Sequence, residues 1–456
     1  MGKRFSHISQ RGYIKMGIKV AKFGGSSVAD AIQLAKVKSI IEADDSRKYV
    51  VVSAPGKRFD GDSKITDLLY LCNTHIEHNV PCDQIFQVVV DRYKAMEMSL
   101  GVQVGLDEEF AEIRQKLEAG EGADYIASRG EYLNAKLTAA YLGMDFVDAA
   151  GLVRFNEKGR FLDEETDQAL AEELKKHERA VIPGFYGTYP DGKIKTFTRG
   201  GSDITGSIVA KAVEAEIYEN WTDVHGFLQA DPRIVKDPEP IATISYSELR
   251  ELSYMGASVL HENAIYPVRG QNIPINIRNT NDPEHPGTMI VSKAKPEDDG
   301  RIITGIAGSK DFTVITLCKN MMSSEKGYIK RLLGILEGYG IGFEHLPSGI
   351  DTVSVVISNK QLNGSLQDIL DEIDRKLNPD SVEVNQDIAL VATVGAGMAK
   401  RRGTAARLFT ALAQAEVNIR MIDQGSSEMN IIVGVNNKDF ETSVRAIYAA
   451  FVTDGK

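Results

Sequence analysis

Between Ile18 and about Ser292, short runs rich in β-branched residues alternate with stretches whose apolar residues recur at helical spacing. Residues 30–42 show the helical pattern, because Ile32, Ala35 and Ile40 repeat at intervals typical of one helix face. A sheet covered by helices requires this alternation, so we predict an α/β domain. The predicted strands are Lys19–Phe23, Tyr49–Ser53, Asp145–Asp148, Ala180–Pro183, Glu216–Trp221, Pro274–Arg278 and Met289–Ser292.

A polar segment, Ser292–Gly300, follows this domain and has the composition of a linker between independently packed units. Beyond it the sequence repeats itself with an offset of 76 residues, and each copy reads strand, helix, strand, strand, helix. Matched positions include Phe312 with Ile388, Val314 with Leu390, Leu332 with Leu408, Leu336 with Leu412, Ile341 with Val417 and Val355 with Ile431. We predict two small units that pair edge to edge, because exposed strand edges are otherwise a liability.

The 456 residues include 43% hydrophobic and 26% charged side chains, as in a folded protein with more than one core. The formal net charge of −11 predicts a surface that repels nucleic-acid phosphates and anionic lipid, and no local basic patch offsets it. No segment approaches the ~20 apolar residues of a membrane span. We therefore expect neither a nucleic acid nor a membrane among the partners.

Three cysteines, Cys72, Cys82 and Cys318, are too few for a disulfide framework in a chain of this length. They predict a reducing compartment, which is the cytoplasm. Residues 1–16 contain basic but no acidic side chains, and no apolar segment of the secretory type follows them. We expect residues 1–16 to be an N-terminal extension.

The first motif that carries chemistry is Lys22-Phe-Gly-Gly-Ser-Ser-Val28, between a predicted strand and a predicted helix. Gly24 and Gly25 allow backbone amides to approach an anion closely, the following helix offers its N-terminal donors, and Lys22 adds a positive charge. This combination is typical of a phosphate-binding loop. A tight glycine turn beside a surface lysine explains the same residues.

The second motif is Thr198-Arg-Gly-Gly-Ser-Asp203, which precedes a helical pattern from Ile204 to about Ala215. Arg199 can grip a carboxylate through its planar fork, and the two glycines expose amides. Asp203 is suited to orient a cation, although Ser202 and Asp203 would also serve as helix N-caps without any ligand. Two Gly-Gly anion loops in one domain favour a substrate with several negative groups.

The third motif is Trp221-Thr222-Asp223, followed by Phe227 and Asp231-Pro-Arg233. A strand that ends in Thr-Asp places polar groups at the carboxyl edge of the sheet, where ligands bind in open α/β folds. The sequence contains neither a Walker-type P-loop nor the His-Arg-Asp and Asp-Phe-Gly motifs of protein kinases. Any phosphates must therefore be held by another architecture.

Two further patterns imitate cofactor sites. Residues 395–400 resemble a dinucleotide fingerprint, but the third glycine is replaced by Lys400 and the repeat unit is too small for a dinucleotide domain. Cys72, His75, His78 and Cys82 have metal-ligand spacing, but successive three-residue steps on one helix turn by about 60° each. We therefore predict no protein-held metal, and a solvated helix face is the better explanation. His261, after a helical pattern, is as well explained by a core or capping role as by catalysis.

The residues resemble the aspartokinase family of the amino-acid kinase superfamily. The resemblance is carried by residues 22–28, Val52-Ser-Ala54, Arg129-Gly-Glu131, residues 199–203 and Trp221-Thr-Asp223, and by the duplicated C-terminal region, which is similar to paired ACT domains. It implies a three-layer kinase domain with a mostly parallel central sheet, followed by two ferredoxin-like ACT βαββαβ units. We expect the kinase domain at residues 17–292, a linker at 293–300, and ACT domains at 301–386 and 387–456.

The resemblance implies transfer of the γ-phosphoryl group of ATP to the β-carboxylate of L-aspartate, giving 4-phospho-L-aspartate, the first step of lysine, threonine and methionine biosynthesis. Phosphoryl transfer needs mainly alignment and charge stabilisation. A carboxylate nucleophile is already ionised at neutral pH, so no general base is required. Mg²⁺ would be held chiefly by the phosphates rather than by a protein cage.

The resemblance also assigns roles, in which Lys22 holds the ATP phosphates and Asp203 orients that lysine. Arg199 would pair with the α-carboxylate of aspartate and Glu131 with its α-ammonium group. The remaining aspartate pocket would be Ser53, Ala54, Thr66, Phe185 and Ser202, and the remaining nucleotide contacts Gly24, Gly25, Ser26, Thr222, Asp223, Phe227 and Arg233. We expect Lys22 and Arg199 to face one another across a shared cleft. One departure is Ser258, which stands where many relatives carry a lysine.

The ACT-like units imply an amino-acid effector that is coupled to the kinase domain. The resemblance assigns its pocket to Met321, Ser324, Tyr328, Ile329, Glu344 and Asp351. The two acidic side chains favour a cationic effector, so we expect lysine rather than threonine, although both acids are equally explained as solvated loop charges. Pairing of ACT edges between subunits would give a homo-oligomer, either a dimer or a tetramer.

Two other functions remain open at this point. A sister kinase that phosphorylates glutamate, acetylglutamate or another small carboxylate would share both anion loops. A catalytically silent amino-acid sensor would use the repeats to bind its ligand and the large domain only as support. Consumption of ATP that depends on added aspartate would separate all three.

Overall fold

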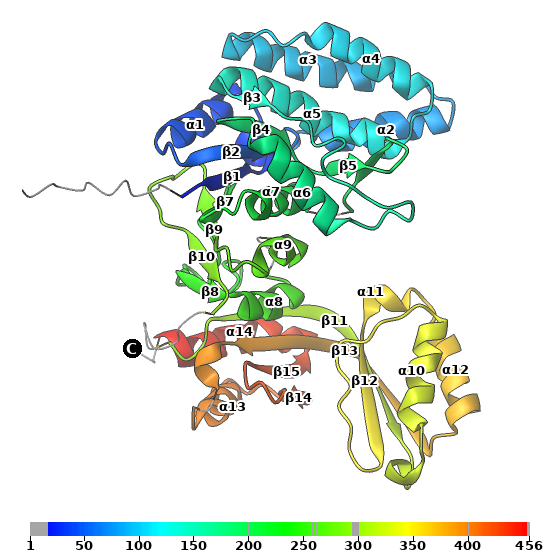
Figure 1. Cartoon of the computed structure of the whole chain (residues 1–456). Helices are drawn as coiled ribbons and strands as arrows, with labels where there is room; N and C mark the ends of the chain where they lie inside the picture. Colours follow the sequence, from blue (N-terminus) through cyan, green and yellow to red (C-terminus); the bar gives the residue numbers. More distant parts are fainter. Residues whose placement is uncertain are drawn as a thin grey trace, which may run out of the picture. The chain divides into compact units, whose positions relative to one another are not determined.

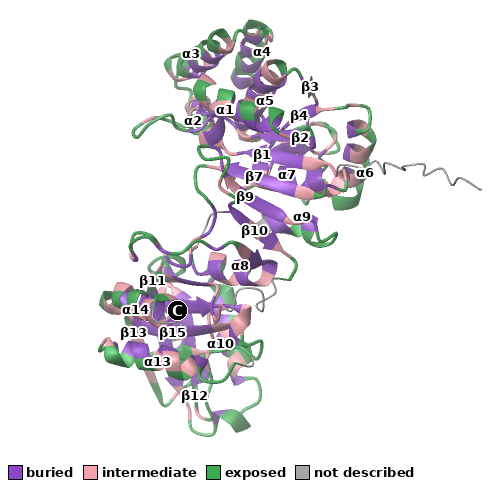
Figure 2. Ribbon diagram, turned by 90° about the vertical axis from the view of Figure 1, so that its left-hand side faces the viewer, coloured by how far each residue is buried: buried purple, intermediate pink, exposed green. Residues whose placement is uncertain are grey.

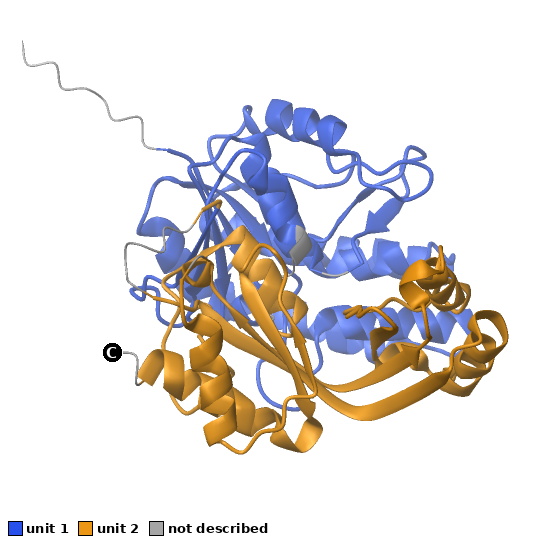
Figure 3. Ribbon diagram, turned by 90° about the horizontal axis from the view of Figure 1, so that it is seen from below, with its two compact units in different colours: residues 1–225, 260–291 blue, residues 226–259, 292–456 orange. Residues whose placement is uncertain are grey.

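The computed structural model divides into two compact units, Met1–His225 with Leu260–Val291, and Gly226–Val259 with Ser292–Lys456 (Figure 3). The structure describes residues 17–198, 200–257, 260, 262–293, 301–399 and 401–453. Among the helices of these residues, none combines the length and the apolar character that a membrane crossing needs.

Unit 1 is built on a mostly parallel sheet (Figure 1). Its strands lie in the order β3 (Asp145–Phe146), β4 (Ala180–Pro183), β2 (Arg47–Val52), β1 (Lys19–Phe23), β7 (Ile217–Thr222), β9 (Ile275–Asn279) and β10 (Thr288–Val291). All neighbours pair in parallel except β9 and β10. The predicted strands are confirmed. Two have the predicted limits, and the others begin or end within two residues of them.

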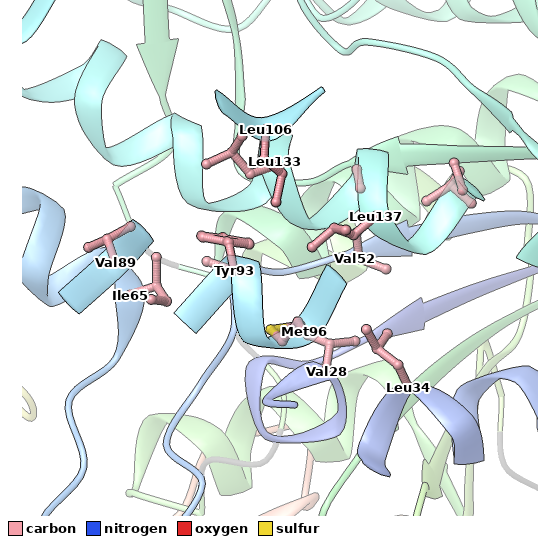
Figure 4. Close-up of a cluster of buried hydrophobic side chains, with 14 of the residues drawn as sticks. Val28, Leu34, Val52, Ile65, Val89, Tyr93, Met96, Leu106, Leu133 and Leu137 are labelled. Atoms are coloured by element: carbon pink, nitrogen blue, oxygen red, sulfur yellow. The ribbon is translucent and has the colours of Figure 1, made fainter. Parts of the chain in front are cut away.

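Helices cover both faces of this sheet and make the three layers expected from the resemblance. One face is covered by α1 (Ala31–Glu42), α2 (Ile65–Glu77) and α5 (Ala123–Leu142), and α3 (Asp83–Leu100) and α4 (Leu106–Glu118) pack on these helices. Side chains from these helices meet strand residues such as Val52 in one core (Figure 4). The other face packs against α7 (Gly201–Ala212), beside α6 (Asp163–Leu174). The hairpin β5 (Tyr186–Thr188) and β6 (Ile194–Thr196) and the short segments η1 (Gly25–Val28), η2 (Glu262–Ile265) and α9 (Tyr266–Arg269) complete unit 1.

The starts of α1 and α7 are capped in different ways. Asp30 caps α1, since its carboxylate accepts a hydrogen bond from the Gln33 amide at 2.9 Å. The prediction that Ser202 or Asp203 would cap the following helix is wrong. Helix α7 already begins at Gly201, and its N-cap is Gly200, whose φ of 60° is the left-handed conformation that glycine adopts without strain. Ser202 and Asp203 therefore lie inside the first turn.

Unit 2 contains an antiparallel sheet in the order β12 (Thr352–Ser358), β11 (Gly305–Cys318), β13 (Ser381–Val394), β15 (Asn430–Asn436) and β14 (Met421–Asp423). Its longer helices are α8 (Tyr246–Tyr254), α10 (Tyr328–Gly338), α12 (Leu366–Leu377), α13 (Thr404–Gln414) and α14 (Phe440–Tyr448). Shorter elements are β8 (Thr243–Ser245), η4 (Met322–Ser324), α11 (Asn359–Leu362), η5 (Ala396–Met398), η6 (Asn437–Asp439) and η7 (Ala449–Thr453).

The two βαββαβ repeats share their longest strands. Residues 312–318 of β11 pair with β12, whereas residues 305–309 pair with residues 390–394 of β13. Each 14-residue strand therefore runs through both repeats, and the second repeat takes its fourth strand from residues 305–309, at the start of the first. Two separate cores result, one around α10 and α12 and one around α13 and α14. The repeat predicted two units, and the exchange of strands is an addition from the structure. The predicted residue boundaries of the domains stay a prediction.

Residues 226–257 belong to the same compact unit as the two repeats. Ala230 and Val235 belong to the core around α13 and α14. Glu248, 2% exposed, accepts hydrogen bonds from the Thr304 hydroxyl at 2.6 Å and the Ala396 amide at 2.8 Å. Figure 2 shows the buried residues of this unit in purple.

The two cores predict matched effects of matched substitutions. Leu332 on α10 and Leu408 on α13 are equivalent in the repeat and fully buried. Leu332→Ala and Leu408→Ala should each lower the free energy of unfolding by about 2–5 kcal/mol, because each leaves a cavity in its own core. Ile422→Ala, on a half-exposed side chain, should change it by less than about 0.5 kcal/mol. Urea denaturation followed by circular dichroism measures all three, and a loss in only one of the two leucine variants would contradict separate cores.

Candidate active site

The loop after β1 forms a cradle with free backbone donors. The Gly24 amide donates to the Trp221 carbonyl at 2.9 Å, and the Gly25 carbonyl accepts from the Gly56 amide at 2.8 Å. A Cβ on Gly25 would lie 3.0 Å from the Ala54 carbonyl oxygen, so the loop is packed too closely for a larger residue. Because the carbonyl and the next amide of a trans peptide point in opposite directions, the Ser26 N–H points away from Gly56. The first N–H groups of η1 have no acceptor inside that helix, so they can donate hydrogen bonds to a bound anion.

Lys22 lies at the end of β1 and is bound to Asp203 across the sheet–helix interface. The distance from Nζ to Asp203 Oδ1 is 2.5 Å, and the lysine side chain is 8% exposed. Asn220, opposite Lys22 on β7, donates its side-chain amide to the same Oδ1 at 3.0 Å. The Tyr218 hydroxyl donates to the Asp203 backbone carbonyl at 3.0 Å. The aspartate therefore has a fixed position, from which it holds the ammonium group at the edge of the cradle.

Asn220 is a member of this site that the sequence prediction missed. The available signal was its place in β7, where Tyr218 and Asn220 point to the same face of a strand that is buried on both sides. A polar side chain at such a position needs a partner, which here is Asp203.

Glu131 is a buried acid on α5, 5% exposed. Burial raises its pKa to about 8, against the opposing effects of the Ala54 amide and the charges of Lys22 and Arg129. Its Oε2 atom is buried and has no hydrogen-bond partner among the described residues. A buried carboxyl group with an unused oxygen is suited to bind a cationic group of a ligand.

The loops that follow β2 and β4 approach the same edge of the sheet. The Ser53 amide donates to the Phe23 carbonyl at 3.2 Å, and Ala54 contacts Glu131 through its amide. Phe185 has a φ of 82°, a strained value for a non-glycine residue, and is held by the Thr205 hydroxyl and by Phe197. A Cβ on Gly184 would lie 2.6 Å from Ser202 Cβ, so this loop packs directly on α7. Thr66 lies, half-buried, in the first turn of α2.

The structure therefore brings together most of the predicted phosphate and aspartate residues at the carboxyl ends of parallel strands, where α/β folds bind ligands. Arg199, Ser258 and His261 lie outside the described residues. The expectation that Lys22 and Arg199 share a cleft is consequently untested.

The predicted nucleotide contacts are divided between the two units. Thr222 and Asp223 end β7 in unit 1, and the Thr222 hydroxyl donates to Asp223 at 3.2 Å. In unit 2, Phe227 is buried and Arg233 binds Asp231 at 2.6 Å, with the arginine side chain 88% exposed. Arg233 also borders a surface hollow of about 550 Å³, whose other lining residues are Leu228, Pro232, Ile234, Lys236, Asp237 and Pro238.

The two histidines of the cysteine–histidine series each place a ring nitrogen beside a backbone carbonyl. His75 Nδ1 lies 3.1 Å from the Pro81 carbonyl, and His78 Nδ1 lies 2.8 Å from the Thr74 carbonyl. Cys72 and Cys82 are buried free thiols. Within the described ranges, no group of three or more His, Cys, Asp or Glu side chains could hold a metal ion.

The glycines of the dinucleotide-like motif serve packing. A Cβ on Gly395 would lie 2.7 Å from Ile303 Cα, and one on Gly397 would lie 2.3 Å from the Arg301 carbonyl oxygen. Both positions are filled by residues 301–304, so these glycines allow two chain segments to touch rather than a pyrophosphate to bind.

The predicted effector residues lie in the first repeat. Met321, with a φ of 59°, and Ser324 belong to the segment between β11 and α10, and Tyr328 and Ile329 begin α10. The Asp351 carbonyl accepts from the Lys319 amide at 2.8 Å, which puts Asp351 beside the start of that segment. The Glu344 amide instead donates to the Val356 carbonyl at 2.8 Å, and Val356 lies about 16 Å from Asp351 along the strand. The hydroxyl of Tyr328 and Oδ1 of Asp351 are buried, without a partner among the described residues.

Comparisons with known proteins agree with this geometry. The model of the amino acid kinase family matches residues 17–279, and an ACT domain model matches residues 391–451. Aspartokinase 3 of Bacillus subtilis (strain 168) is 39% identical over 449 residues, which are 95% of this chain and 98% of that protein. The chain belongs to the aspartokinases of the amino acid kinase family.

Solved aspartokinase structures share the whole fold. The crystal structure of Clostridium acetobutylicum aspartate kinase is 51% identical with a TM-score of 0.88, covering 95% of this chain and all of that one. E. coli aspartokinase III in complex with aspartate and ADP (R-state) is 26% identical, with a TM-score of 0.75 over 95% of this aspartokinase and 99% of that chain. The same protein in complex with lysine and aspartate (T-state) is 25% identical, with a TM-score of 0.74 and the same coverage.

The raised pKa of Glu131 predicts a pH-dependent stability. An unfolded glutamate ionises near pH 4.5, whereas Glu131 in the folded, ligand-free enzyme ionises near pH 8. Between these values the folded state keeps a proton that the unfolded state has lost, so the free energy of unfolding falls as pH rises. Glu131→Gln removes this effect. The stability of the variant relative to the parent should therefore rise from about pH 5 to 8, by at most about 1.4 kcal/mol per pH unit.

Urea denaturation of both proteins at intervals across this pH range makes the comparison. Glu112→Gln is the control, because Lys116 lowers the pKa of Glu112, and its difference from the parent should stay flat. A flat difference for Glu131→Gln as well would contradict a protonated, buried Glu131.

Proposed function

We propose that the enzyme transfers the γ-phosphoryl group of ATP to the β-carboxylate of L-aspartate, as the first step of lysine, threonine and methionine biosynthesis. The observation that carries this proposal is the Lys22–Asp203 pair beside a loop with free amides. A fixed cation and fixed donors suit a triphosphate whose charge shifts during transfer, and they need no rearrangement when it does. Aspartate and ADP are the ligands named for the E. coli relative.

In this proposal Lys22 binds the phosphates, with the amides of Gly25 and Ser26, while Asp203 orients the lysine. The expectation that Gly24 also lends its amide is wrong, because the Trp221 carbonyl already accepts a hydrogen bond from it. Arg199 pairs with the α-carboxylate of aspartate and Glu131 with its ammonium group. Because Glu131 is protonated near neutral pH when no ligand is bound, aspartate binding releases a proton from it. Ser53, Ala54, Thr66, Phe185 and Ser202 line the pocket, and Thr222, Asp223, Phe227 and Arg233 contact the nucleotide.

We expect Mg²⁺ to enter with the nucleotide. Mg²⁺ is usually bound through substrate phosphates and one or two carboxylates, so we expect oxygens of the phosphates to provide most of its coordination. The three free thiols, of which Cys72 and Cys82 are buried, are consistent with work in the reducing cytoplasm.

Regulation by lysine is part of the proposal, through Met321, Ser324, Tyr328, Ile329, Glu344 and Asp351. Lysine is a named ligand of the E. coli relative in its T-state. The unpartnered carboxylate oxygen of Asp351 supports a cationic ligand at the β11–α10 segment. The Glu344 amide is bonded to Val356, further along β12 than Asp351, so one lysine would reach both acids only by spanning that distance. We expect the ACT repeats, at residues 301–386 and 387–456, to join subunits into a dimer or tetramer.

A coupled ADP-release assay with a panel of acceptors tests the activity. Aspartate should support ADP release at least 100-fold faster than glutamate or N-acetylglutamate. Preference for another carboxylate would favour the sister kinase, and no ADP with any acceptor would favour the silent sensor.

The same assay tests Lys22. Lys22→Ala should lower kcat by about 100-fold or more, because it removes the fixed charge at the phosphates. Lys19→Ala is the matched control on the same strand, since Lys19 pairs instead with Asp44 at 2.7 Å. Near-normal turnover in Lys22→Ala, or an equal loss in both variants, would reject the assigned role.

Titration of the activity with lysine and with threonine separately tests the effector. Lysine should inhibit, and Asp351→Asn should raise the lysine concentration for half inhibition at least tenfold without changing kcat. Indifference of the parent enzyme to both amino acids would remove the regulatory part of the proposal.

A further inference from the structure

Arg92 on α3 is a buried arginine that binds two loops of the site at once. Its guanidinium group donates to the Ser63 carbonyl at 2.8 Å, to the Ala29 carbonyl at 3.2 Å and to the Gly56 carbonyl. Its NH1 also lies 3.4 Å from Asp62. The residue is 5% exposed. Ala29 directly follows η1 of the cradle, whereas Gly56 and Ser63 belong to the loop between β2 and α2.

Gly56 connects Arg92 to the phosphate cradle through the two peptide groups on either side of its Cα. The Gly56 carbonyl accepts from Arg92, and the Gly56 amide donates to the Gly25 carbonyl at 2.8 Å. A Cβ on Gly56 would lie 2.6 Å from the Gly25 carbonyl carbon, so the two loops touch without space for adjustment. The Gly25 carbonyl in turn sets the direction of the Ser26 N–H, because a trans peptide is planar. The guanidinium is therefore two hydrogen bonds away from a donor that faces the cradle.

Arg58 provides a comparison within the same loop. It binds Asp62 through Nε at 2.8 Å and NH2 at 3.1 Å, with a side chain that is 39% exposed. Arg58 therefore pairs with the same carboxylate as Arg92. Among the described residues it has no hydrogen bond to a backbone carbonyl of the cradle or of Gly56. Its loss would change the charge around Asp62 without releasing the loops.

We infer that Arg92 is a positioning residue for phosphoryl transfer, which holds the Gly56 and Gly25 peptides so that the Ser26 amide is aimed at the phosphates of the nucleotide. This inference rests on the proposed phosphoryl transfer. Neither Arg92 nor its helix α3 is among the residues to which that proposal gives a role. The planar fork matters because one ammonium group cannot reach carbonyls on both loops in the same geometry.

Kinetics of Arg92→Ala and Arg92→Lys, with Arg58→Ala as the control, test this inference. Arg92→Ala should lower kcat at least tenfold and raise the Kd for ADP, measured by calorimetry, at least tenfold. Methylguanidine at millimolar concentration should restore part of both values by filling the vacated site. Arg92→Lys should retain the fold, shown by an unchanged circular dichroism spectrum, and still lose at least fivefold in kcat. Arg58→Ala should stay within twofold of the parent.

A purely structural arginine would give another pattern. If Arg92→Lys, or a folded Arg92→Ala, had parent values of kcat and ADP affinity with only a lower melting temperature, the inference would be wrong. Equal losses in Arg58→Ala would also overturn it. If Arg92→Ala does not fold, Arg92→Lys decides. Failure of the proposed reaction itself would be seen first as absent aspartate-dependent ADP release by the parent, whereas the ADP affinities would still report on Arg92.

Discussion

The Lys22–Asp203 ion pair is the constraint on which the rest of the site depends. A lysine at the end of the central strand is nearly buried, and a buried charge is tolerated only with a partner and hydrogen bonds. Asn220 and Tyr218 hold that partner from the neighbouring strand β7. The ammonium group is thereby fixed before any ligand arrives. Such preorganisation is what a reaction needs when it depends on charge stabilisation rather than on a proton-transferring base.

The surroundings of this pair are held from several directions. The cradle is bonded to the Trp221 carbonyl on one side and to Gly56 on the other. Beneath it, the Trp221 indole donates to Glu219, which binds Arg47 in a second buried ion pair at 2.7 Å. Glu131 differs from these charged pairs, because its burial raises its pKa and favours the neutral carboxyl group until a cation binds. One edge of the sheet therefore presents a fixed positive charge and an acid whose ionisation depends on the ligand.

Local patterns predicted the strands, the helix of residues 30–42, the repeat and the two glycine loops, because each is encoded within a few neighbouring residues. Contacts between residues far apart in the sequence could not be predicted from such patterns. Arg47 and Glu219 are 172 positions apart and lie in runs that read as plain buried strands. Arg92 had one signal, a charge inside the apolar stripe of Phe86, Val89, Tyr93 and Met96. The shared strands β11 and β13 were missed because their polar middles, around residues 309–311 and 385–387, read as loops. The family resemblance supplied roles that spacing alone left open.

The most direct test of the central claim is a crystal structure of the enzyme with ADP and aspartate. We expect Lys22 Nζ to lie within hydrogen-bonding distance of a phosphate oxygen while it keeps its contact with Asp203, with the Ser26 amide facing the same phosphate. ADP bound away from residues 22–28, or Lys22 still paired only with Asp203 while the phosphates lie elsewhere, would contradict that claim.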